Sequence, residues 1–202
     1  MAIIRANNNT LSAVTALPSA ISTGSNIIEV IAGVCDGRSV TVPSGTYTMP
    51  NVTDQQILTT AYADVTGSSF TYTPPSDATK VIYHFQVMFN RSDDNPIAHC
   101  RFYIDSDEAT AYRKTIRAQQ AQILMDMKYI IDCNAGSNDT ATAKFTSWTS
   151  NKTMKIQARE YSSTYEAMFH DILNWDGGAE SGSGAGATYT QPFLTIMALK
   201  DS

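Results

Sequence analysis

Hydrophobic and polar residues alternate with a period of two in the clearest segments of the chain. Within Lys80–Phe89, one set of alternate positions holds Val81, Tyr83, Phe85, Val87 and Phe89, and the other holds Ile82, His84, Gln86 and Met88. Successive side chains of a β-strand point to opposite faces, so this segment is the strongest predicted strand. Both faces carry apolar residues, which indicates that neither face simply lies in water.

The same alternation recurs at short intervals. Ile97–Asp105 places Cys100, Phe102 and Ile104 on one face and His99, Arg101 and Tyr103 on the other. Further strands are expected at Ser39–Val42, Thr46–Met49, Leu58–Val65, Ser69–Thr73, Ala111–Ala118, Ala141–Thr149, Thr153–Tyr161 and Tyr189–Leu199. About eight to ten short strands separated by turns predict an all-β fold, a sandwich or jelly roll.

Two segments have a mixed period. Gln119–Tyr129 fits a helix as well as a strand, and Tyr165–Trp175 is equally ambiguous. The neighbouring β-elements favour a strand for the first of these segments.

The N-terminal part differs from the rest. Residues 1–34 hold too little hydrophobic mass for a core of their own, and Pro18 and Gly24 interrupt them. We interpret them as an extended attachment arm, followed by a small β collar at 35–55 and a head domain at 56–202. A merely loose terminus is the alternative. The expected anchors of the arm are Ile3, Ile4, Leu11, Val14, Leu17 and Ile21.

The charge composition argues against a nucleic-acid partner. Charged residues make up 16% of the chain, against a typical value of about 25%. The net charge is −5, and lysine and arginine form no run. A surface that tracks phosphates is therefore not expected.

The three cysteines indicate a protein that folds in a cytoplasm. Cys35, Cys100 and Cys133 cannot all pair within one chain, and their spacing fits no zinc template. We interpret them as buried, reduced thiols. Neither a signal peptide nor a membrane-spanning apolar run is evident, so membrane insertion is not expected.

Several residues could carry chemistry, but each has a simpler interpretation. His84 and His99 lie on strands that could be neighbours. They could form a metal-binding or acid–base pair, or they could be polar groups at a subunit contact. His170 and Asp171 are adjacent and would point apart on a strand. Acidic residues at turns could serve glycoside hydrolysis, although turn formation explains them equally well: Asp93, Asp94, Asp105, Asp107, Glu108 and Asp176. We therefore expect no catalytic, cofactor or metal site.

The two-sided strand instead predicts a subunit interface. If one face of Lys80–Phe89 packs in the domain core, the other face would lie against a partner chain. The expected interface residues are Ile82, His84, Gln86, Met88, His99, Arg101 and Tyr103.

These segments also resemble a known family. Ser69–Ser76, Lys80–Val87, Ile97–Asp105 and Gln191–Leu199 resemble strands in the C1q/TNF-like jelly-roll heads of virion proteins of tailed phages. The N-terminal sequences Ala2–Leu11 and Ala16–Ile21 resemble those of structural proteins from phages of marine bacteria and cyanobacteria.

The resemblance implies a homotrimer with an N-terminal segment that binds other virion proteins. It implies a fibre, spike or tail-appendage head that contacts a host surface glycan or protein, or a capsid decoration protein. It supplies no catalytic residues. A polysaccharide-degrading enzyme that uses the loop carboxylates remains the alternative of another class, and a lectin-like module outside a virion is a third.

Overall fold

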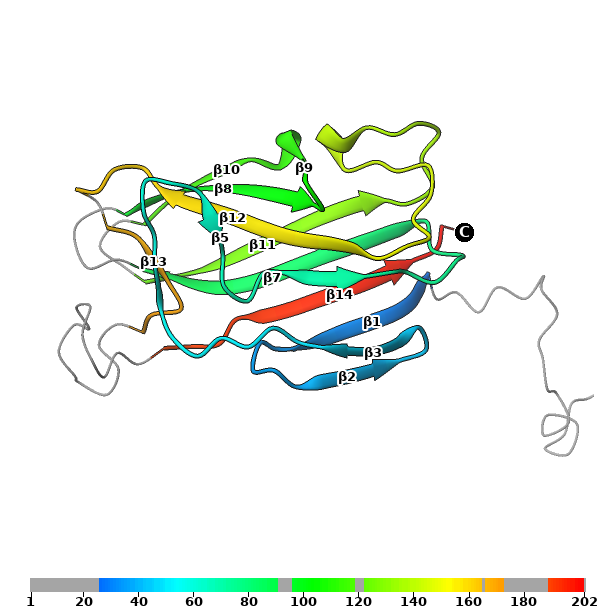
Figure 1. Cartoon of the computed structure of the whole chain (residues 1–202), viewed down its shortest axis with the longest axis horizontal. Helices are drawn as coiled ribbons and strands as arrows, with labels where there is room; N and C mark the ends of the chain where they lie inside the picture. Colours follow the sequence, from blue (N-terminus) through cyan, green and yellow to red (C-terminus); the bar gives the residue numbers. More distant parts are fainter. Residues whose placement is uncertain (1–25, 91–95, 119–121, 165, 173–188, 202) are drawn as a thin grey trace, which may run out of the picture.

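The computed structural model describes residues 26–90, 96–118, 122–164, 166–172 and 189–201, which form a sandwich of antiparallel sheets (Figure 1). In the first sheet, strands β1, β14, β7 and β11 lie side by side, and the short strands β13 and β4 extend the β14 side of β7. The bounds are β1 Ile27–Val34, β14 Phe193–Leu199, β7 Lys80–Asn90, β11 Ile123–Asp132, β13 Met168–Phe169 and β4 Gln56–Ile57.

The second sheet packs against the first and has β8 and β12 at its centre. Strand β10 pairs with β8 on one side, and β5 and β6 pair with β12 on the other. The bounds are β10 Lys114–Arg117, β8 Ile97–Ile104, β12 Lys152–Glu160, β5 Ala63–Asp64, β6 Phe70–Tyr72 and β9 Asp107–Glu108, which pairs with the end of β8. Two short 3-10 helices, η1 Thr110–Tyr112 and η2 Thr140–Thr142, lie beside this sheet.

The connections make this a jelly-roll β-sandwich, as the sequence predicted. The chain crosses from the second sheet to the first between β6 and β7 and returns between β7 and β8. It crosses again between β10 and β11, between β11 and β12, and between β12 and β13. Strands that follow one another in sequence therefore lie mostly in opposite sheets.

The core lies between the two sheets, and β7 is at its centre. Val81, Tyr83, Phe85, Val87 and Phe89 are all buried, as their alternation predicted. Aromatic rings join the sheets: the ring centroid of Phe102 on β8 lies 5.2 Å from that of Tyr83 and 4.2 Å from that of Tyr129 on β11. Such ring pairs add to the stabilisation from burial alone.

All three cysteines are buried free thiols. Burial raises the pKa of Cys35, Cys100 and Cys133 to about 12 in each case. Thiols with so high a pKa are unreactive at neutral pH, so these residues act as small apolar side chains.

Three expected strands are shorter than predicted or absent. Leu58–Val65 contains only β5, because the chain leaves the first sheet after β4 and crosses to the second. Ala111–Ala118 begins in η1 before β10. Ala141–Thr149 forms no strand: it contains the end of η2 and then a loop that places Trp148 in the core.

The ambiguous segments are resolved where they are described. The expected strand at Gln119–Tyr129 corresponds to β11, and residues 119–121 lie outside the described part of the chain. In Tyr165–Trp175, β13 comprises only Met168–Phe169, and residues 165 and 173–175 lie outside the described part.

The end of the expected arm belongs to the head. Strand β1 pairs with β14 along its length, and its Ile31 is completely buried. Cys35, Met49 and Val52 of the expected collar belong to the same core. The apolar cluster of residues 27–31 therefore completes the first sheet. The expected anchors Ile3 to Ile21 lie outside the described residues.

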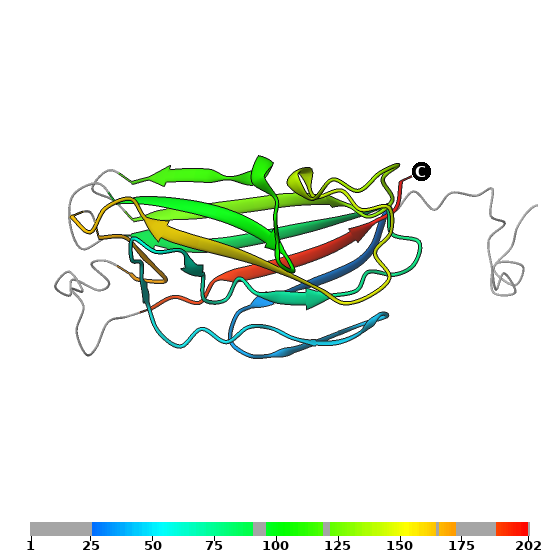
Figure 2. The same cartoon turned by 45° about the horizontal axis from the view of Figure 1, so that its top comes forward.

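The hairpin of β2 (Ser39–Val42) and β3 (Gly45–Thr48) closes one side of the sandwich beside β1 (Figure 2). Tyr47 of β3 packs on Phe70 and Tyr72 of β6, with ring centroids 5.7 and 5.5 Å apart. The buried Glu29 carboxylate on β1 accepts hydrogen bonds from the Tyr72 hydroxyl and from the backbone N–H and hydroxyl of Ser44. One carboxylate thus ties together both sheets and the hairpin.

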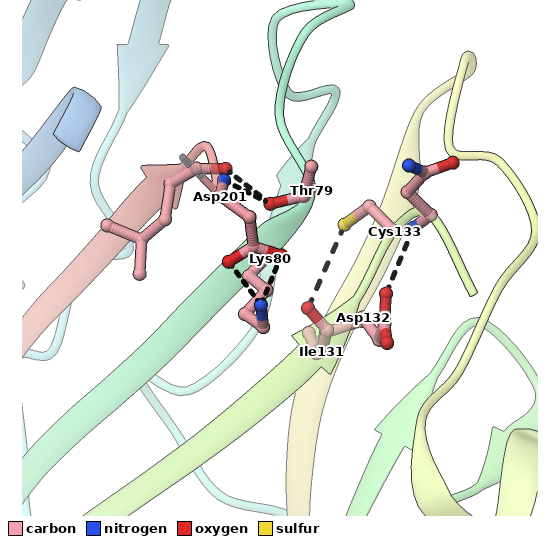
Figure 3. A network of polar contacts seen from close by, with 8 residues as sticks. Thr79, Lys80, Ile131, Asp132, Cys133 and Asp201 are labelled. Atoms are coloured by element: carbon pink, nitrogen blue, oxygen red, sulfur yellow. Dashed lines mark hydrogen bonds and ion pairs between the residues drawn. The ribbon is translucent and has the colours of Figure 1, made fainter. Parts of the chain in front are cut away.

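The first described residues and the C-terminal residues lie at the same end of the sandwich, where β7 begins (Figure 1). The backbone N–H of Lys200 donates to the carbonyl of Asn26 over 2.8 Å. The Thr79 hydroxyl accepts from the backbone N–H of Asp201 over 2.9 Å, and Lys80 forms an ion pair with the Asp201 carboxylate (Figure 3). This anchored end is where the chain of residues 1–25 joins the head.

Gly67 occupies a turn that only glycine fits. Its φ is +84°, and a Cβ atom there would lie 2.7 Å from Cγ2 of Val52 and 2.9 Å from Cγ of Pro192. Both the backbone conformation and the close packing therefore exclude a larger residue.

We expect Gly67→Ala to lower the free energy of unfolding by about 2 kcal/mol, from backbone strain and overpacking. Gly136→Ala is the matched control, because no atom lies within 4 Å of its Cβ position. Urea unfolding of both variants measures the difference. Equal stability of the two would contradict this account of the turn.

Candidate functional site

The outward side chains of β1, β14, β7 and β11 form one broad surface, which we call the assembly face. The strand registers align them in rows across the four strands. Val30, Met197, Ile82 and Ile130 form a row that is apolar throughout. Such a row across a whole sheet is unusual on a surface that faces water.

Apolar residues on this face are well exposed in the single chain. The exposed fractions are 41% for Val30, 50% for Ile130, 59% for Leu124 and 40% for Phe193. The partly buried Met88 lies opposite Leu124 in the register. The extent of this apolar surface is typical of an interaction site rather than of scattered surface residues.

A polar pair lies at the centre of the assembly face. His84 Nε2 contacts the Asp126 carboxylate diagonally between β7 and β11. Lys128 of β11 lies directly opposite His84 of β7 in the strand register. The surface therefore combines apolar rows with a few charged groups, as subunit interfaces do.

The outer surface of the second sheet is polar and charged rather than apolar. The outward side chains of β10, β8 and β12 form what we call the charged face. Across it, Arg101 is opposite Gln157 and His99 is opposite Arg159 and Thr115. Lys155 forms an ion pair with Asp64 over 3.0 Å. These side chains are suited to water and polar ligands.

The seven expected interface residues do not form one patch. Ile82, His84, Gln86 and Met88 lie on the assembly face, and all four are partly buried in the single chain. His99, Arg101 and Tyr103 lie on the charged face. The expectation that His84 and His99 lie on compatible faces of neighbouring strands is wrong, because the jelly-roll connection places β7 and β8 in opposite sheets.

A small pocket opens on the charged face. Its volume is about 190 Å³, and Tyr62, His99, Arg101, Arg113 and Thr115 contribute to its lining. The guanidinium of Arg101 lies 3.7 Å from the ring centroid of Tyr62, and that of Arg159 lies 5.4 Å from it. Both guanidinium groups thus make cation–π contacts with the same tyrosine ring.

Glu108 is the counter-ion of this pocket. Its carboxylate lies 2.5 Å from Nε of Arg113 and 3.6 Å from Nε of Arg101. The hydrogen bond from Arg113, with the charges of both arginines, holds the pKa of Glu108 below its usual value. Glu108 therefore remains charged and orients both guanidinium groups at neutral pH.

Little in the sequence indicates this pocket. Its cations come from β8, β12 and the loop before β10, and Tyr62 comes from the crossing between β4 and β5. Arg159 could have been noticed as an outward position, because Met154, Ile156 and Ala158 occupy the alternate positions of its strand. Nothing in the sequence indicates that Tyr62 lies over Arg101.

Buried polar residues gather at the other end of the sandwich from the anchored end. Asn90 Nδ2 donates to the Asp171 carboxylate over 2.7 Å, and Gln122 Nε2 donates to the Asp171 carbonyl over 2.5 Å. His170 Nε2 donates to the carbonyl of Thr66 over 3.0 Å. Burial lowers the pKa of His170 to about 4, so its ring is neutral at pH 7. The geometry fits a structural histidine better than a general base.

The acidic candidates are partly described. Asp105 has a positive φ of 55°, and its carboxylate accepts from the backbone N–H of Thr153, which is a turn role. Asp93, Asp94 and Asp176 lie outside the described residues. Over the described ranges, no group of three or more histidine, cysteine or acidic side chains could hold a metal ion. The same ranges contain no helix long and apolar enough to span a membrane.

The pKa of His170 predicts a loss of stability in acid. The unfolded chain binds a proton near pH 6.5 and the folded chain only near pH 4, so unfolding takes up a proton between these values. We expect the wild type to lose about 3 kcal/mol more than His170→Asn as the pH falls from 7 to 4. Asparagine tolerates the positive φ of 69° at this position.

Urea unfolding at several pH values measures this difference, and the variant itself is the control for all other titrating groups. Parallel stability curves of the wild type and the variant would contradict the low pKa.

Comparisons with known proteins identify no relative by sequence. No family profile and no curated protein matches the chain. Among solved structures, the chain is similar to that of the infectious bursal disease virus Gt strain, with 11% identity and a TM-score of 0.28 over 82% of this chain and 44% of that chain. The VP2 subviral particle of the same virus matches with 9% identity and a TM-score of 0.29, over 82% and 43%.

The chain thus spans less than half the length of these viral proteins. At such low similarity the comparison carries no argument about function.

Proposed function

We propose that this chain is a structural protein of a tailed-phage virion and acts by assembly and binding rather than by catalysis. In this proposal, its jelly-roll head forms a homotrimer, and the segment that precedes β1 attaches it to other virion proteins. The head would serve as a fibre, spike or tail appendage that contacts the host surface. A capsid decoration protein with the same head is the alternative within this class.

The observation that carries the proposal is the apolar row on the assembly face. Val30, Met197, Ile82 and Ile130 expose apolar surface across four adjacent strands, whereas the opposite outer face is charged. Burying such a surface stabilises by roughly 25 cal/mol per Å². In the proposal, other copies of the same chain bury the assembly face, because the family resemblance of the strands implies a trimer.

The position of the chain ends supports attachment through the N-terminal segment. Asn26 is held at the anchored end by Lys200. Residues 1–25 therefore join the head at one end of the sandwich, and the strand ends at Asn90 and Ile97 lie at the other. A head with this arrangement can be attached at one end and leave the other end and the charged face accessible.

A depolymerase on the same scaffold finds less support. Among the described acidic candidates, Glu108 is bound by two arginines and Asp105 stabilises a turn. Two free carboxyl groups that face each other across a substrate cleft are what glycoside hydrolysis needs.

The trimer is tested by light scattering of the full chain at micromolar concentration. We expect a mass of about 66 kDa, three times the 22.0 kDa of one chain. Ile130→Asp should dissociate the trimer, because burying an unpaired carboxylate costs on the order of 3 kcal/mol at each interface.

The matched control is Ile57→Asp, because Ile57 is 40% exposed but lies on β4, outside the apolar row. It should remain trimeric. Circular dichroism checks that both variants are folded. A wild-type mass of 22 or 44 kDa, or a trimer that survives Ile130→Asp, would overturn the proposed assembly.

A further inference from the structure

We propose that the pocket beside Tyr62 binds an acidic saccharide through its carboxylate or sulfate group. The inference deepens the proposed contact with a host surface and rests on the proposed function only for the biological source of the sugar. The pocket itself belongs to one chain, so binding does not require the trimer.

The charge at the pocket is positive. Its lining includes Arg101, Arg113 and Lys114 but no acidic residue, and the guanidinium of Arg159 contacts the tyrosine ring of the same lining. Glu108 is the carboxylate that pairs with Arg101 and Arg113. The whole chain has a net charge of −5, so this cluster of cations stands out from its surroundings. A positive site on an acidic protein favours a small anion over a cation or a neutral group.

Arg101 is held in place but is not fully covered. Tyr62 stacks on its guanidinium, and Glu108 forms an ion pair with its Nε over 3.6 Å. The side chain is therefore fixed in position, while 31% of it stays exposed to a ligand. A guanidinium held in this way loses little entropy when it binds an oxyanion, and it can bind two oxygens at once.

The pocket is small, and its remaining lining includes polar groups. A volume of about 190 Å³ is below the range of about 300–1,000 Å³ for drug-sized ligands, so the pocket fits one small group. His99 and Thr115, which are hydrogen-bonded to each other over 3.0 Å, add an imidazole and a hydroxyl. The cations could bind the acid group of a sugar, and the neighbouring polar groups could bind its hydroxyls. This combination matches one acidic sugar unit.

A nucleic acid fits less well. A polyanion needs a continuous basic track, whereas Lys155 and Lys152 on the same sheet are already paired with Asp64 and Asp105. The pocket therefore offers one site for one anionic group.

The test is calorimetric titration of the full chain with glucuronic acid and galactose 6-sulfate, with glucose and sodium sulfate as reference ligands. We expect at least one acidic sugar to bind, glucose not to bind, and inorganic sulfate to bind at least about tenfold more weakly than that acidic sugar. Binding should weaken as the salt concentration rises.

Two variants locate the site. Arg159→Gln removes a cation, and Arg113→Gln removes a cation and also frees the Glu108 carboxylate to repel the ligand. Each should weaken acidic-sugar binding at least about tenfold. Lys200→Gln is the matched control with the same change of charge, because its partner Asp77 is remote from the pocket. It should bind as the wild type does.

Several results would overturn the inference. The wild type could bind neither acidic sugar, or it could bind glucose or inorganic sulfate as tightly as the acidic sugar. Both arginine variants could also bind the acidic sugar as tightly as the wild type does. Light scattering of the same samples reports the trimer separately. A trimer that binds no acidic sugar would refute only this site, and a monomer that binds one would refute only the assembly.

Discussion

Strand β7 lies between β14 and β11, and the alternation of its side chains determines both faces of the first sheet. Its inward set packs against β8 through Tyr83 and Phe102 and forms the centre of the core. Its outward set, from Ile82 to Met88, is then forced onto the surface of a single chain. Because strand periodicity is two, the sequence cannot bury one set without exposing the other. The proposed assembly follows from this constraint.

The two outer faces of the sandwich have different roles in this account. The assembly face is apolar with His84 and Asp126 at its centre, and such polar groups can set the register between subunits. On the charged face, arginines held by Tyr62 and Glu108 form a pocket. In the proposed function, one sheet serves assembly and the other serves ligand contact.

Much of the fold could be predicted from the sequence, because strands with strict alternation such as β7 and β8 appear with their inward residues as expected. Segments of mixed pattern were less predictable: Ala141–Thr149 alternates, yet it forms a loop that brings Trp148 into the core. The partition of strands between sheets was not predictable, since alternation specifies faces but not neighbours. For this reason His84 and His99 were expected together and lie on opposite sides. The pocket was missed because Tyr62 and the arginines come from segments that are far apart in the sequence and meet only through the order of strands in the second sheet.

The central claim is that sister chains cover the assembly face. Hydroxyl-radical footprinting with mass spectrometry of the full-length protein tests it most directly. Phe193 on the assembly face and Tyr161 at the end of β12 are both aromatic and have exposed fractions of 40% and 56% in the single chain. We predict that Tyr161 is oxidised readily, whereas Phe193 and Leu124 are protected as core residues are. Oxidation of Phe193 at a rate like that of Tyr161 would contradict the account.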